Sequence, residues 1–183
     1  SDVERLKKRV DELAERLKRL DEELKKEVDR IETELRELLK RHEDRNRDIS
    51  RRLAELLKDA RERELEEIVR EVVERSERTL REVEEIVRRV VEDARRLVRD
   101  SERISKEVEE RMKRLVEEVK DVDKKEIVER ILEELDRLME KVERVSREIL
   151  KTIEKLARDI KKRIEEVTRE SERLAREVEE ALR

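Results

Sequence analysis

Apolar residues recur at steps of three and four along almost the whole chain, and neither glycine nor proline interrupts them. Steps of this size place side chains on one face of an α-helix, because the helix turns once every 3.6 residues. A chain without helix-breaking residues can keep such a face continuous over many turns. The pattern therefore predicts an all-α fold built from long amphipathic helices.

The composition supports this prediction and excludes several classes of protein. Of the 183 residues, 59% are charged and 34% are hydrophobic, and none is aromatic or cysteine. The net charge is only −4 and the two signs are interleaved, so there is no basic surface for nucleic acid or anionic lipid. No apolar run is long enough to span a membrane, and disulfides and thiolate metal sites are excluded. The regular apolar spacing argues against disorder, despite the high charge.

The apolar stripe changes phase at residues 58–65 and again at 120–127, which divides the chain into three segments of similar length. Three pairs of residues near the segment starts have the spacing of a helix-capping box: Ser1 with Glu4, Asp59 with Glu62, and Asp123 with Glu126. Two short joints between periodic segments predict one long antiparallel up-down-up three-helix bundle, coiled-coil-like, over residues 1–183. We expect its helices at about residues 2–58, 62–120 and 124–182.

A single uninterrupted helix, held in solvent by pairs of Glu and Lys or Arg four residues apart, is the alternative architecture. Each such pair contributes only about 0.2–0.5 kcal/mol. A solvated helix also has no use for a continuous apolar stripe, so the bundle is the favoured interpretation.

The apolar stripe is interrupted by polar residues in each of the three segments. The interruptions are His42 and Asn46 in the first segment, Ser76 and Thr79 in the second, and Thr168 and Ser171 in the third. In an antiparallel bundle, facing residue numbers add up to about 122 across the first joint and about 244 across the second. Asn46 then faces Ser76, which faces Thr168. We expect a buried hydrogen-bonded layer that specifies the register of the helices.

His42 also has to be considered as a metal ligand or a general base. The stretch 42–46 superficially resembles the start of a His-Glu-x-x-His zinc-protease helix, but Asn46 occupies the second histidine position. His42 is the only histidine in the chain, so we expect no catalytic, metal-binding or cofactor-binding site. An alternative interpretation, that His42 lies at the edge of the core and points to solvent, stays open.

A second group of polar residues consists of Ser101, Ser105 and Ser146, which face a leucine-rich part of the first segment. No partner for them is evident there. They could form a second polar patch, or each hydroxyl could bond to the carbonyl four residues earlier in its own helix.

These features together resemble computationally designed helical bundles with buried hydrogen-bond networks. The resemblance rests on Glu/Lys/Arg surfaces, Leu/Ile/Val cores, three equal helices and the layer around His42. It covers the whole chain but carries over no active residue, and two departures are the lack of loop glycines and the oligomeric nature of many such designs. Spectrin-like repeats, by contrast, normally bury tryptophans, which are absent here.

The resemblance implies a structural scaffold and not an enzyme, and the low contact order and many aliphatic core residues predict that it resists heat. We expect a monomer without cofactor, partner or natural localisation, soluble as in recombinant cytoplasmic expression. A second hypothesis is an interaction module, a subunit of a helical oligomer that binds another helix or self-associates through an open apolar face.

Overall fold

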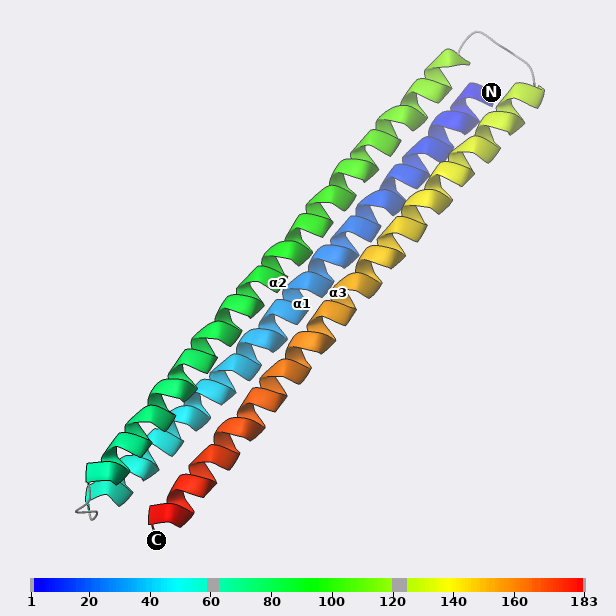
Figure 1. Cartoon of the computed structure of the whole chain (residues 1–183). Helices are drawn as coiled ribbons and strands as arrows, with labels where there is room; N and C mark the ends of the chain where they lie inside the picture. The colour runs from blue at the N-terminus through cyan, green and yellow to red at the C-terminus, as the bar shows by residue number, and fades with distance from the viewer. Residues whose placement is uncertain (1, 59–62, 120–124, 183) are drawn as a thin grey trace. The chain divides into compact units, whose positions relative to one another are not determined.

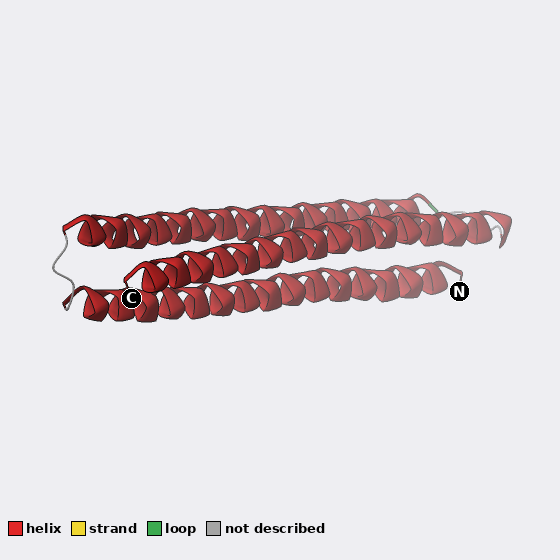
Figure 2. Ribbon diagram, turned by 60° about the horizontal axis from the view of Figure 1, so that its bottom comes forward, coloured by secondary structure: helices red, strands yellow, loops and turns green. Residues whose placement is uncertain are grey.

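The computed structural model describes residues 2–58, 63–119 and 125–182, which form three α-helices (Figure 1). The helices are α1 (Asp2–Lys58), α2 (Arg63–Glu118) and α3 (Lys125–Leu182). The described residues contain no strand, as the ribbon of Figure 2 shows. The prediction of an all-α three-helix bundle is confirmed, and the single uninterrupted helix is wrong.

The observed ends of the helices lie within one or two residues of the expected ones. Both joints lie outside the described residues, and so do the expected capping residues Ser1, Asp59, Glu62 and Asp123.

Charged residues at the helix ends favour these boundaries. Asp2 and Glu4 lie in the first turn of α1, Glu64 and Glu66 lie in the first turn of α2, and Lys58 lies in the last turn of α1. The helix dipole places partial positive charge at the first turn and partial negative charge at the last. Each of these side chains therefore has the sign that stabilises its own helix end.

The chain divides into two compact units, and each contains a part of every helix. Unit 1 consists of Ser1–Asp29 and Asp93–Glu154, and unit 2 consists of Arg30–Glu92 and Lys155–Arg183. In both units the buried residues follow the apolar stripe expected from the sequence, so each core is made by one face of each helix.

The core of unit 1 is aliphatic and includes both methionines of the chain, Met112 and Met139. Its α1 residues lie at heptad positions. The buried members are Leu6, Val10, Leu13, Leu17, Met112, Val116, Val119, Val128, Ile131, Leu135, Met139 and Val142. A smaller cluster in unit 2 consists of Ile49, Leu53, Val69, Ala175 and Val178.

Contacts within the units give the direction of each helix. In unit 1, Ser101 of α2 contacts Asp21 and Arg95 contacts Asp29, so residue numbers fall along α2 as they rise along α1. These numbers add up to about the value expected for antiparallel helices joined by a short loop. The α1–α3 contacts instead join residues 127 positions apart, as parallel helices require.

Candidate functional site

His42 lies on the buried face of α1 in unit 2, with only 2% of its surface exposed. Its Nδ1 atom is 2.9 Å from the Thr168 hydroxyl of α3, and its Nε2 atom is 3.4 Å from the amide nitrogen of Asn46. The interpretation that His42 points to solvent is therefore wrong, and the imidazole belongs to the core.

The hydrogen bonds around Thr168 indicate which ring nitrogen of His42 carries the proton. The Thr168 hydroxyl donates its only hydrogen to the Ile164 carbonyl at 2.8 Å, so it accepts from His42 Nδ1–H. His42 Nε2 is then unprotonated and can accept from the Asn46 amide across a long contact. The pattern assigns the neutral Nδ1–H tautomer.

The surroundings of His42 oppose a charge on the ring. Burial lowers the pKa of His42 below its ordinary value of 6.5, and the positive charge of Arg45 lowers it further. Glu172 of α3 raises the pKa, but this carboxylate is also held by Arg45 at 2.6 Å. Burial has the larger effect, so His42 is neutral near pH 7.

The structure joins three of the six expected layer residues by hydrogen bonds, namely His42, Asn46 and Thr168. Ser171 is buried and Ser76 is half-buried, but among the described residues neither hydrogen-bonds to this group. The Thr79 hydroxyl instead donates to the Arg75 carbonyl of its own helix at 2.8 Å. A helical threonine reaches the carbonyl four residues back without any neighbour, which explains why α2 contributes no hydrogen bond to His42.

A second polar cluster lies in unit 1, where Ser101 of α2 donates to the Oδ1 atom of Asp21 at 3.0 Å. The expectation that α1 holds no partner for these serines is wrong. Ser105 and Ser146 are buried as well, but the Ser105 Oγ atom has no hydrogen-bond partner among the described residues. We call Asp21, Ser101 and Ser105 the Asp21 cluster.

The surroundings of the Asp21 carboxyl group disfavour its negative charge. Burial raises the pKa of Asp21 above its ordinary value of 3.8, and the nearby negative charge of Glu102 raises it further. The hydroxyls of Ser105 and Ser101 lower the pKa, but not enough to cancel the effect of burial. Ser105 acts here through its proximity, because it does not reach hydrogen-bonding geometry.

Sequence reasoning missed Asp21 because it lies one position beyond the apolar stripe, next to Leu20, where a charged residue normally faces solvent. A signal was nevertheless available. The numbers of Asp21 and Ser101 add up to the value expected for facing residues of α1 and α2, so each charged residue beside the stripe could have been checked against the serines.

Ion pairs follow the edge between α1 and α3, and each joins residues 127 positions apart. The pairs are Arg9–Asp136 and Arg16–Glu143 in unit 1, and Glu34–Lys161, Arg45–Glu172 and Arg52–Glu179 in unit 2. Their side chains are partly exposed, so each contributes only about 0.2–1 kcal/mol. All five pairs nevertheless share the same offset of 127 residues, so together they define the register of two parallel helices.

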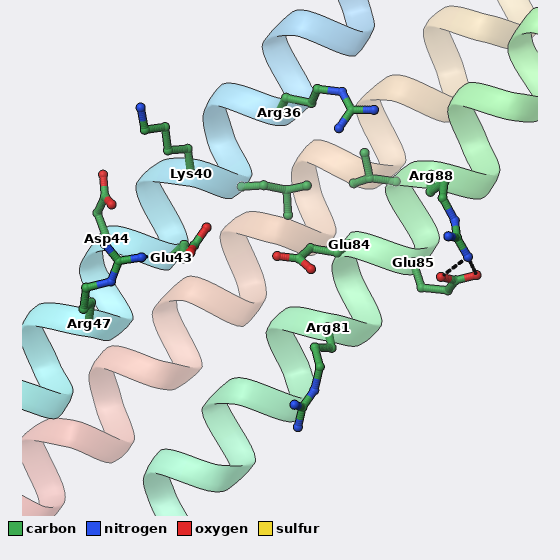
Figure 3. Close-up of a pocket in the computed structure, with 11 residues that line it drawn as sticks. Arg36, Lys40, Glu43, Asp44, Arg47, Arg81, Glu84, Glu85 and Arg88 are labelled. Carbon is green, nitrogen blue, oxygen red and sulfur yellow. Dashed lines mark hydrogen bonds and ion pairs between the residues drawn. The ribbon is translucent and has the colours of Figure 1, made fainter.

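A surface groove between α1 and α2 in unit 2 is lined mainly by charged side chains of both signs (Figure 3). Glu85 and Arg88 form an ion pair on its α2 side, and Arg36 and Lys40 extend from its α1 side. Only Leu39 and Val87 among its lining residues are apolar. The groove therefore lacks the apolar walls that usually enclose a small ligand.

No group of three or more His, Cys, Asp or Glu side chains is placed to hold a metal ion within residues 2–58, 63–119 and 125–182. In the same part of the chain, every helix is too polar to cross a membrane. Comparison with protein-family models, curated proteins and solved structures found no match to this chain.

Proposed function

We propose that this chain is a designed structural scaffold, a three-helix bundle without catalytic activity whose polar residues serve the specificity of its own fold. The observation that carries this proposal is the position of His42, which is the only imidazole of the chain. Both of its ring nitrogens contact side chains of the core, so neither is directed to a substrate or a metal. A catalytic base must instead lie within reach of the proton that it removes from a substrate.

The ion pairs between α1 and α3 support the same proposal. In four of the five pairs α1 supplies the arginine, but in the Glu34–Lys161 pair it supplies the carboxylate. A shift of α3 by seven residues would place Glu34 opposite Glu154 or Thr168. Such a shift keeps apolar residues in the core, so this pair distinguishes registers that the apolar stripe alone does not.

Replacement of His42 tests the scaffold proposal. The variant His42→Leu should keep its helical circular dichroism and its solution mass, with stability at pH 7 equal to or above that of the parent protein. Apolar replacement of a buried polar group is often neutral or favourable when the partners keep other hydrogen bonds, as Thr168 does with Ile164. A variant that keeps its helical content but changes its solution mass would contradict the proposal, because His42 would then serve an assembly and not the fold of one chain.

An interaction module that binds another helix is the second candidate, and the edge between α2 and α3 in unit 1 favours it. Every interhelical ion pair named above has α1 as one partner, whereas this edge carries half-buried Val108 and Leu115 of α2 beside Leu138 of α3. Such an edge could be covered by a further amphipathic helix.

Multi-angle light scattering at micromolar concentration separates the two candidates. The scaffold proposal requires the mass of one chain, 22.5 kDa. A mass of two or three chains that returns to one chain in the variant Leu115→Glu would favour the interaction module, because a charge on this edge disrupts an apolar interface.

A further inference from the structure

Among the described residues, burial is the largest cause of the pKa shift for two side chains of α1, and each belongs to a different unit. His42 lies in the core of unit 2, and Asp21 lies half-buried against α2 in unit 1. The remaining buried polar residues are serines and one asparagine, which do not titrate. Acidification therefore acts on the polar cluster of unit 2 through His42 and on that of unit 1 through Asp21.

The site of His42 is built for the neutral ring. Its Nδ1–H donates to Thr168, and its Nε2 faces the amide nitrogen of Asn46. A second proton would place an N–H opposite the Asn46 amino group and would bury a positive charge close to Arg45.

The charges around His42 offer little compensation for that proton. Glu172 of α3 is shared with Arg45. On α2, the Thr79 hydroxyl donates to its own helix, and the charged Arg81 and Glu84 lie around the surface groove (Figure 3).

The site of Asp21 supplies few hydrogen bonds to a carboxylate. A carboxylate can accept about four hydrogen bonds, but here Ser101 supplies one and the buried Ser105 supplies none. Glu102 of α2 adds a like charge. A neutral carboxyl group loses less on burial than a carboxylate does, so this environment favours the proton.

No positively charged side chain is among the causes of the pKa shift of Asp21. Lys25 of α1 and Arg99 of α2 line a surface groove beside the cluster, and Arg95 is paired with Asp29. From α3, Glu143 is held by Arg16, and no charge of α3 contributes to the pKa shift of Asp21.

We propose that the two units respond to protons in opposite directions, so that acidification below pH 6.5 first loosens unit 2 around His42 and further acidification towards pH 4 tightens unit 1 around Asp21. The bundle thereby contains a pH-sensitive conformational device in which one unit opens locally while the other stays closed.

The direction in each unit follows from proton binding. The folded pKa of His42 is lowered, so the unfolded state binds more protons and stability falls as pH drops from 6.5 towards the folded pKa. The folded pKa of Asp21 is raised, so the folded state binds more protons and stability rises as pH drops through the folded pKa to 3.8. In unit 2 the pKa of Glu34 is lowered by Lys161, which adds a further loss below pH 4.5.

Native-state amide hydrogen exchange of the full chain tests this proposal. Exchange is measured at pH 7, 6, 5 and 4 in a constant subdenaturing concentration of guanidinium chloride, with correction for the intrinsic exchange rates. The opening equilibrium constant of amides around His42 and Thr168 should rise by up to about tenfold per pH unit below pH 6.5 until the folded pKa is reached. Amides around Asp21 and Ser101 should keep their protection between pH 7 and 5 and gain protection towards pH 4.

Two variants test which ionisable group causes the pH response of each unit. His42→Leu should remove the loss in unit 2 between pH 7 and 5 and leave unit 1 as it was. Asp21→Asn, which mimics the neutral carboxyl group, should remove the gain in unit 1 and leave the loss in unit 2.

Equal changes of protection in both units, or a loss in unit 2 that persists in His42→Leu, would overturn the proposal. A titration of the parent protein by NMR gives a check that needs no variant. A folded pKa of His42 at or above 6.5 would overturn the mechanism directly.

Discussion

At the scale of single residues, the stability that a buried polar group contributes depends on its partner rather than on its burial. Ser101 and Ser105 are one helical turn apart and are buried to a similar extent, at 3% and 6% exposure. Ser101 donates to the Asp21 carboxylate, whereas the Ser105 hydroxyl has no described hydrogen-bond partner. A hydrogen bond to a charged group stabilises by about 1.5–3 kcal/mol, whereas an unsatisfied buried hydroxyl costs about 1–3 kcal/mol.

The variants Ser101→Ala and Ser105→Ala should therefore differ in stability. Removal of Ser101 should cost about 1–2 kcal/mol at pH 7, because Asp21 loses its hydrogen-bond donor. Removal of Ser105 should stay within about 0.5 kcal/mol of the parent, because the relief of an unmet hydroxyl offsets the loss of its effect on the pKa of Asp21. Guanidinium midpoints measure both, and a loss for Ser105→Ala as large as that for Ser101→Ala would contradict the assignment.

The hydrogen bond between His42 and Thr168 can be isolated with a matched pair of threonines. Thr168 and Thr152 each donate to the carbonyl four residues earlier, but only Thr168 also accepts from His42. Thr168→Val should destabilise the protein by about 1 kcal/mol more than Thr152→Val at pH 7, because it leaves the buried Nδ1–H without an acceptor. Equal effects in denaturant unfolding would show that the contact contributes nothing.

At the scale of the helices, α1 differs from α2 and α3 in how it is held. It contributes His42, Asn46 and Asp21 to the polar clusters, and it takes part in all five of the ion pairs along its edge with α3. The apolar stripes tolerate a shift by one heptad, because core residues then meet other core residues. The charged edge resists such a shift, since the sign of the Glu34–Lys161 pair is reversed relative to its neighbours.

A double-mutant cycle on this pair tests the register argument. Glu34→Lys and Lys161→Glu should each reduce stability, and the double variant should recover part of the loss, with a coupling of about 0.2–1 kcal/mol. The control cycle exchanges Glu165 and Arg169, which are exposed, lie 3.9 Å apart within one helix and should couple more weakly. A coupling energy no larger than that of the control would show that the Glu34–Lys161 pair does not help to specify the register of α1 and α3.

At the scale of the whole molecule, many of the described contacts join residues that are close in sequence within one helix. The ion pairs between α1 and α3 recur at a constant offset. Long helices with many buried aliphatic residues give low contact order and high local propensity. The described backbone contains no residue with positive φ and no cis peptide bond, so it stores no strain at such positions.

We expect the chain to resist heat strongly. Far-ultraviolet circular dichroism should show nearly complete helix that persists above about 90 °C at pH 7, the range of hyperstable domains. A cooperative melt below about 65 °C, where ordinary domains unfold, would contradict this expectation.

Much of the polar core could be located from the sequence, but its bonding could not. The burial of His42 and Asn46 followed from their place on the apolar stripe. The facing-number rule placed Thr168 in the same layer, but level with Asn46, whereas Thr168 bonds to His42. Thr79 was assigned to the same layer, yet it bonds to its own helix because that carbonyl is always within reach. The half-burial of Asp21 depends on how far α1 is rotated towards α2, which a periodic pattern does not specify.

The sequence by itself determined the helices, their approximate ends, the up-down-up order and the positions where the core becomes polar. These properties follow from helical periodicity and chain connectivity, which are readable residue by residue. Only the tertiary structure decided that Ser101 meets Asp21, that Thr168 rather than Ser76 bonds to His42, and that Glu34 meets Lys161. Hydrogen bonds and pKa shifts depend on separations of about 3 Å, and the relative rotation and rise of packed helices set those separations.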